Sequence, residues 1–224
     1  MPEEFLLNDV EVRVLGSLIE KQLTTPEYYP LTLNALTHAC NQISNRDPVV
    51  SYDEKTIVRA LESLREKNLA YIFYGSESRV PKYKHVVPEV LHLTPQQTAV
   101  MCVLMLRGPQ TVGEIRGRTT RLYEFKELPE VETTLEELIN QEPQPLVARL
   151  PRQPGRKESR YAHLLSGPVE AEAQETQPPR PETARLAVQT GNERIGRLEA
   201  EVERLRQEVA ELRQQLDDFR KQFE

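Results

Sequence analysis

The chain has 224 residues, 38% of them hydrophobic and 29% charged, with a formal net charge of -6. This length allows two small domains or one domain with an extension, and the longest apolar run, residues 99–106, is too short to cross a bilayer. The negative charge excludes a protein that is basic over its whole surface, but the middle of the chain is slightly basic, so a local DNA-binding face stays possible.

Two helices are predicted at the start of the chain. Asn8 and Glu11 form a capping box, which indicates a helix that begins there and continues to Lys21. Its apolar stripe consists of Val10, Val14, Leu15, Leu18 and Ile19. After a loop with two prolines, a second helix is expected over residues 32–42, and the segment Asn-Arg-Asp-Pro at 45–48 then breaks the chain.

A third helix followed by a β-hairpin is predicted next. Ser51 and Glu54 are spaced as a capping box. The apolar residues that follow at helical spacing are Ile57, Val58, Leu61 and Leu64. Residues 70–74 and 80–85 have the composition of two strands joined by a turn. Residues 1–92 are therefore predicted to form winged-helix domain 1, with a recognition helix and a wing.

The same order of elements is predicted again over residues 93–165. Capping boxes at Thr94 and Thr111 start two helices, and a third helix follows. Residues 146–149 and 159–163 are expected to be the wing strands, and the last strand of each copy carries the same pattern of basic residue, tyrosine, any residue and histidine. The duplication predicts winged-helix domain 2 and an α+β fold that is mainly helical, with small β-hairpins.

The end of the chain is predicted to be a linker and a coiled coil. Residues 166–192 are rich in Pro, Glu, Gln, Thr and Ala and are expected to be disordered. Over residues 193–224, apolar residues alternate at spacings of three and four, which favours a parallel two-stranded coiled coil and a homodimer. The dimerisation residues are Ile195, Leu198, Val202, Leu205, Val209, Leu212, Leu216 and Phe219. The alternative is a helix that folds back on its own domain.

The composition gives no indication of secretion or of a metal or cofactor site. No basic apolar leader precedes the first helix, and Cys40 and Cys102 fall among apolar residues of predicted helices, so two buried thiols in a reducing cytoplasm are expected. The four histidines are scattered, and no glycine-rich phosphate loop is present. We therefore expect no metal, no cofactor and no enzymatic activity.

Four stretches of the chain resemble the YceH family of bacterial proteins. They are residues 11–21, residues 29–42 together with 45–48, residues 78–85, and residues 107–116. The resemblance covers about residues 5–165. It implies a tandem winged-helix fold in a bacterial cytoplasm, and it implies no reaction.

Candidate DNA-contacting residues come from the first copy. Its third helix presents polar and basic side chains opposite the core stripe, and its wing adds three basic residues. The set is Lys55, Thr56, Arg59 and Ser63 on the helix, and Arg79, Lys82 and Lys84 on the wing. These side chains suit phosphates and base edges of duplex DNA. Glu62 and Glu66 lie on the same side of the helix, so an ordinary mixed-charge surface is the alternative.

Two further stretches contain basic residues. The second copy has an acidic third helix, without lysine or arginine over residues 128–140, beside a basic wing. The basic residues of that wing are Arg149, Arg152, Arg156, Lys157 and Arg160. The wing is either a phosphate-contacting arm or a solvated loop. The loop 41–48 consists either of ordinary turn residues or of an exposed binding loop in which Arg46 is the contact residue.

Two functions of different classes follow from these features. The first is a dimeric DNA-binding regulator, which the duplicated winged helices and the coiled coil favour. The second is a non-catalytic adaptor, in which a protein partner binds domain 2 and the coiled coil assembles a complex; the acidic helix favours it. The sequence favours DNA binding by a narrow margin.

Overall fold

The computed structural model describes residues 6–74, 80–152 and 158–168, and residues 1–172 group as one compact unit. A second unit, residues 173–224, lies outside the described residues, as does the whole predicted coiled coil from Ile195 to Phe219. The first unit combines α-helices with two small antiparallel sheets, which confirms the predicted α+β class. Among the described residues, none of the helices has both the length and the apolar character that a membrane span requires.

The first half of this unit contains three main helices and a three-stranded sheet. Its elements are α1 (Asp9–Thr24), the 3-10 helix η2 (Pro26–Tyr28), β1 (Leu31–Thr32), α2 (Leu33–Cys40), α3 (Glu54–Glu66), β2 (Ala70–Phe73), β3 (Lys82–His85) and the short α4 (Val87–Val90). The sheet order is β1-β3-β2, with both pairs antiparallel. The predicted hairpin is present, whereas β1 was not predicted, because two residues are too few for an alternating pattern.

The second half repeats this order with a smaller sheet. Its elements are α5 (Pro95–Arg107), α6 (Val112–Thr119), α7 (Leu128–Ile139), β4 (Val147–Arg149) and β5 (Tyr161–His163). β4 pairs with β5 in antiparallel register, and Gln110 forms an isolated bridge to Tyr161. This bridge precedes α6 just as β1 precedes α2, so the three main helices and the hairpin of the two halves correspond.

The helix starts follow the predicted capping boxes except at α3. Asn8 caps α1, Thr94 caps α5 and Thr111 caps α6, each with its reciprocal Glu or Gln. The prediction that Ser51 caps α3 is wrong. Asp53 is the N-cap, and its Oδ1 accepts a hydrogen bond from the backbone N–H of Thr56 at 2.8 Å. Since α3 begins at Glu54, Ser51 lies too far ahead of the free N–H groups.

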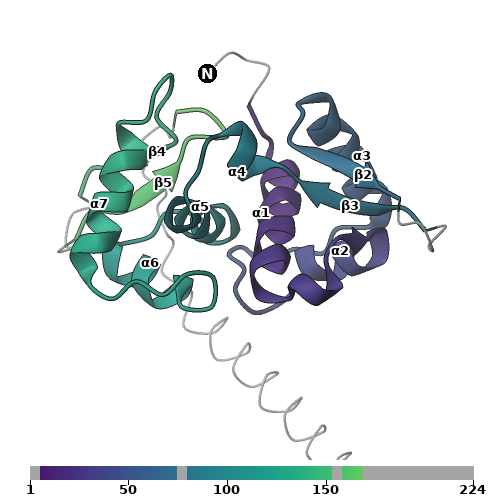
Figure 1. Cartoon of the computed structure of the whole chain (residues 1–224), viewed down its shortest axis with the longest axis horizontal. Helices are drawn as coiled ribbons and strands as arrows, with labels where there is room; N and C mark the ends of the chain where they lie inside the picture. The colour runs from purple at the N-terminus through teal and green to yellow at the C-terminus, as the bar shows by residue number, and fades with distance from the viewer. Residues whose placement is uncertain (1–5, 75–79, 153–157, 169–224) are drawn as a thin grey trace, which may run out of the picture. The chain divides into compact units, whose positions relative to one another are not determined.

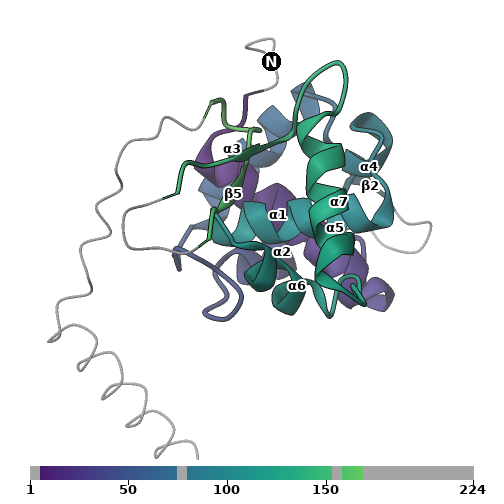
Figure 2. The same cartoon turned by 90° about the vertical axis from the view of Figure 1, so that its left-hand side faces the viewer.

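Helices α1 and α5 lie together at the centre of the unit, with α2, α3 and the larger sheet on one side and α6, α7 and the smaller sheet on the other (Figures 1 and 2). Both central helices are buried on all sides over residues 11–20 and 97–106. Their close approach depends on Gly16, because a Cβ there would lie 3.0 Å from Leu106 and 3.2 Å from Met105. One hydrophobic core therefore runs through both halves.

The buried side of α1 carries three charged residues, each with partners. Glu11 accepts hydrogen bonds from Lys67 Nζ at 2.7 and 2.9 Å. Arg13 donates to the carbonyl oxygens of Cys40 and Pro48 at 3.2 and 2.6 Å. Glu20 forms an ion pair with Arg46 at 2.6 Å. Because an unpaired buried charge is strongly destabilising, these contacts are what allow α1 to be enclosed.

The two cysteines are free and buried, as predicted. Cys102 Sγ donates to the carbonyl oxygen of Gly16 at 3.5 Å, across the contact between α5 and α1. Burial raises the pKa of Cys40 to about 11, and it also raises the pKa of Cys102. Both thiols therefore stay protonated and unreactive at neutral pH.

Candidate nucleic-acid interface

Helix α3 presents an exposed stripe that carries cations in its first half and carboxylates in its second half. Ile57, Ala60, Leu61 and Leu64 are buried, and Lys55 and Arg59 are exposed on the opposite side. Residues four apart on a helix are neighbours, so these two cations lie together in the first half of α3. Glu62 and Glu66 occupy the second half of the same stripe. Arg59, the nearer of the two cations, is separated from Glu66 by roughly 10 Å along the helix axis.

The hairpin of β2 and β3 adds a face that is both basic and aromatic. Tyr71 pairs with Lys84 and Phe73 with Lys82 in the antiparallel register. Directly opposed residues point to the same side of a sheet, so these four side chains share one face. Tyr71 is 37% exposed and Phe73 is 42% exposed, and Lys84 Nζ lies 5.6 Å from the centre of the Tyr71 ring. The sequence reasoning identified the two lysines but missed the two aromatic residues.

The opposite face of the hairpin belongs to the core. Ala70 and His85 are buried, and Leu31 of β1 lies on the same side through its pairing with Tyr83. The backbone N–H of His85 donates to the Tyr29 hydroxyl at 2.8 Å. One face of the hairpin is thus anchored to the core, and the opposite face presents Tyr71, Lys82 and Lys84. The strand periodicity of two, combined with the register, would have revealed this face.

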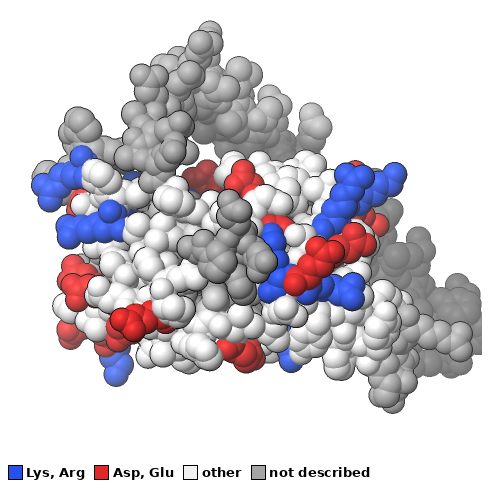
Figure 3. Space-filling model, turned by 90° about the horizontal axis from the view of Figure 1, so that it is seen from above, with Lys and Arg blue, Asp and Glu red and all other residues white. Residues whose placement is uncertain are grey.

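The surface of the unit is mixed in charge rather than uniformly basic. Viewed from above, lysine and arginine side chains gather at the two ends, with acidic residues beside them and a largely uncharged surface between (Figure 3). A nucleic-acid contact would therefore have to be local, as for a single helix and hairpin.

Two of the predicted contact residues on α3 have partners within the protein. Thr56 is half-buried, and its hydroxyl bonds to the Asp53 carboxylate; this bond and the backbone N–H of Thr56 lower the pKa of Asp53. Ser63 is also half-buried and bonds to Glu11. Burial raises the pKa of Glu11, but hydrogen bonds from Lys67 and Ser63 outweigh burial and lower it overall. Placing Ser63 on the outer side of α3 was therefore wrong.

Arg46 is not an exposed contact residue, and that interpretation of the loop was wrong. Its side chain is fully buried, and its Nη1 and Nη2 donate to the two Glu20 carboxylate oxygens at 3.1 and 2.6 Å. The same guanidinium donates to the carbonyl oxygen of Ala39. Next to it, the backbone N–H of Asp47 donates to Leu106 of α5. The loop is therefore structural: its arginine compensates a buried carboxylate of α1 within the first half, and its Asp47 N–H joins the first half to α5.

In the described residues of the second half, the hairpin places only one basic–aromatic pair, Arg149 opposite Tyr161, on one face. α7 exposes carboxylates along its length, and two of them have local partners. Glu130 accepts from the backbone N–H of Lys126 at 2.9 Å, and Glu137 accepts from Gln97 Nε2 at 3.0 Å. Part of the acidic character of α7 is thus explained by contacts within the protein: Glu130 at the helix start and Glu137 against α5.

The basic wing of the second half is only partly available. Arg160 Nη1 donates to the carbonyl oxygen of Pro109 at 2.6 Å and forms an ion pair with Glu114 at 3.0 Å. It is therefore half-buried rather than a free phosphate contact, which corrects its predicted role. Arg152 is exposed. Arg79, Arg156 and Lys157 lie outside the described residues.

The described residues thus define a mixed helical and antiparallel-sheet protein of two corresponding halves, one with a basic and aromatic hairpin. The family model described as "Protein of unknown function, DUF480" matches residues 7–156. The chain is 60% identical to a UPF0502 protein of Geotalea daltonii over 87% of this chain and 88% of that protein. It is 58% identical to a UPF0502 protein of Geobacter sulfurreducens over 89% and 90%. The chain belongs to this bacterial family, which is compatible with its resemblance to YceH proteins.

Proposed function

We propose that this protein is a non-catalytic, dimeric, tandem winged-helix protein of the YceH type that binds double-stranded DNA through its first half. In this interpretation α3 is the recognition helix, and the hairpin of β2 and β3 is the wing. The coiled coil, residues 193–224, joins two copies. A cytoplasmic location remains a prediction from the two thiols.

The proposal rests above all on the hairpin face of Tyr71, Phe73, Lys82 and Lys84, where the two aromatic rings are exposed and the two lysines are half-buried. Lysine ammonium groups bind backbone phosphates, and aromatic rings pack against sugars and bases. The two lysines are held two residues apart on one strand, which separates them by roughly 7 Å. Because both lysine side chains are fixed to the same face, this distance between them matches the spacing of successive phosphates better than the distance between two randomly placed surface lysines does.

The charge order of α3 supports the same surface. Recognition helices contact base edges with their N-terminal residues. Lys55 and Arg59 occupy the N-terminal part of α3, and the acidic Glu62 and Glu66 follow behind. Asp53 and Glu54 are accounted for by capping and by the helix dipole, which favour carboxylates at a helix start.

The test is a fluorescence-anisotropy salt series with a random duplex and the full-length protein. Two double variants remove paired cations: Lys55→Gln with Arg59→Gln on α3, and Lys82→Gln with Lys84→Gln on the hairpin. Each lost phosphate contact should reduce the slope of log affinity against log salt by about 0.9. The hairpin variant should therefore reduce the slope by about 1.8, the α3 variant should reduce it less because its cations also meet base edges, and both should weaken binding at low salt.

The matched control is Lys126→Gln with Arg149→Gln, which removes the same charge from exposed positions of the second half. It should retain the wild-type slope. If the control reduces affinity as much as the two variants do, the first-half interface is excluded in favour of the second wing, to which Arg149 belongs, or of a diffuse charge effect.

A protein-binding adaptor is the second candidate, favoured by the surface of α7. Leu128 is 44% exposed at its start, and exposed carboxylates follow it, a combination suited to a basic protein partner and unsuited to DNA. Absence of duplex binding at any salt concentration would favour this function over the first.

A further inference from the structure

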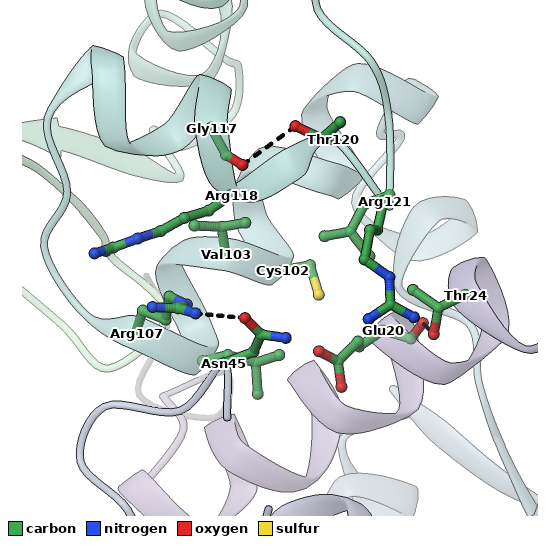
Figure 4. A pocket seen from close by; sticks show the side chains of 12 residues that line it. Glu20, Thr24, Asn45, Cys102, Val103, Arg107, Gly117, Arg118, Thr120 and Arg121 are labelled. Carbon is green, nitrogen blue, oxygen red and sulfur yellow. Dashed lines mark hydrogen bonds between the residues drawn. The ribbon is translucent and has the colours of Figure 1, made fainter. Parts of the chain in front are cut away.

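A pocket of about 310 Å³ lies where the two halves meet, at the ends of α1 and α5 and beside α6 (Figure 4). Three arginines from different positions line it: Arg107 at the end of α5, Arg118 in α6, and Arg121 just after α6. Val103 and Leu106 of α5 contribute apolar surface. None of the three arginines was a candidate in the sequence, because their spacing of eleven and three residues gives no recognisable pattern.

The arginines approach the pocket from two sides. Figure 4 places Arg107 on one side and Arg121 across from it near Thr24 and Glu20, while the Arg118 guanidinium on the side of Arg107 extends away from Arg121. Arg107 donates one hydrogen bond to Asn45 Oδ1. Arg118 reaches Glu114 only at 3.7 Å. Within the described part of the chain, Arg121 has no hydrogen-bond or ion-pair partner. Most of the guanidinium N–H groups are therefore available to a ligand.

Glu20, the acidic residue that lines the pocket, and Glu114, the partner of Arg118, are already compensated. Both Glu20 carboxylate oxygens accept hydrogen bonds from the buried Arg46, and Lys21 lies 3.8 Å away. Glu114 is closer to Arg160, at 3.0 Å, than to Arg118. The charge that remains is positive. Consistent with this, burial lowers the pKa of Arg107, and the charge of Arg118 lowers it further.

We propose that this pocket binds a small phosphate-bearing anion, such as a diphosphate or a phosphate monoester. Planar guanidinium forks bind phosphate oxygens in pairs, and donors on two sides suit a group whose oxygens point in several directions. The volume lies at the lower end of the range for small-molecule sites, about 300–1,000 Å³. The ligand would touch α1, α5 and α6 at once and would stabilise the contact between the halves. The proposal does not depend on DNA binding.

The experiment uses the full-length protein with sodium pyrophosphate as the probe, measured by thermal shift and by isothermal titration calorimetry. Sodium chloride at equal ionic strength and sodium citrate are the reference anions. Pyrophosphate should raise Tm by several degrees at saturation, whereas chloride should not. A shift by citrate as large as that by pyrophosphate would overturn the phosphate assignment.

Arg121→Gln is the decisive variant, because Arg121 is exposed and its loss leaves no internal group unpaired. It should weaken pyrophosphate binding about tenfold or more, the effect of losing a charge-assisted hydrogen bond. Arg65→Gln is the control, because it removes the same charge from an exposed position on α3 that does not line the pocket. Equal weakening in both variants, or no pyrophosphate binding by the wild type, would overturn the proposal.

Discussion

The two halves share one order of elements but use their arginines and hairpins differently. In the first half, Arg46 is enclosed and the hairpin lysines face outward beside Tyr71 and Phe73. In the second half, Arg160 of the hairpin turns inward to Glu114, and α7 exposes carboxylates. The fold alone therefore does not decide which half contacts a ligand; the orientation of individual cations does.

The largest expected difference between the halves concerns these two arginine–glutamate pairs. Arg46→Met should destabilise the protein by about 3–5 kcal/mol, because it leaves the Glu20 carboxylate buried without its partner. Arg160→Met should cost about 1 kcal/mol or less, because its pair with Glu114 is partly exposed to solvent. Urea unfolding followed by circular dichroism measures both.

A similar loss in both variants would show that the pairs are equivalent despite their different burial. Glu20→Gln with Arg46→Met tests the cause further. If the buried charge is responsible, the double variant should recover part of the loss.

The contact between the halves offers a second, smaller effect at glycine positions. Gly16→Ala should destabilise by about 1–3 kcal/mol, because the new Cβ would lie 3.0 Å from Leu106 Cδ2. Gly117→Ala is the matched control within α6, where a Cβ meets no atom within 4 Å among the described residues. It should stabilise by roughly 0.5–1 kcal/mol through helix propensity. Thermal unfolding of both variants distinguishes close packing from propensity; destabilisation of equal size in both would contradict the close contact at Gly16.

The smallest expected effect is the pH dependence of stability caused by the two corresponding histidines. Burial lowers the pKa of His85 and of His163 to about 4. The N–H of Val87 donates to His85 Nδ1 at 3.3 Å, so this nitrogen is unprotonated in the folded state. As pH falls below the ordinary value of 6.5, the unfolded chain takes up a proton first, and stability is lost down to about pH 4. His85 should contribute about 1.4 kcal/mol of loss at pH 5.5.

The variant His85→Asn keeps an acceptor for Val87 and removes the titration. Its stability should fall less between pH 7 and pH 5.5 than that of the wild type, whereas His38→Asn, at an exposed position, should behave like the wild type. His163 should contribute a loss of similar size, because burial lowers its pKa to about the same value. An unchanged pH profile in His85→Asn would show that this histidine does not titrate with folding.

Local chemistry in the sequence was sufficient for the helix starts and the two hairpins. Asn8 and Glu11 satisfy free N–H groups within one helical turn. A strand with alternating residues pairs its backbone with the strand next to it in the hairpin. These interactions join residues close in the chain, so spacing alone indicates them. Ser51 failed as a cap because α3 begins only at Glu54, where the Asp53 carboxylate is in place to accept from the backbone N–H of Thr56.

The role of each charged side chain, in contrast, was decided only by the tertiary structure. From the sequence, Arg46 is predicted to be a loop residue. The packing of α1 brings Glu20, 26 positions away, against it. Arg107, Arg118 and Arg121 line one pocket only because α5 and α6 meet the end of α1. The sequence does not indicate whether a charged side chain will face water or a buried partner. Its environment depends on which remote element removes the solvent around it.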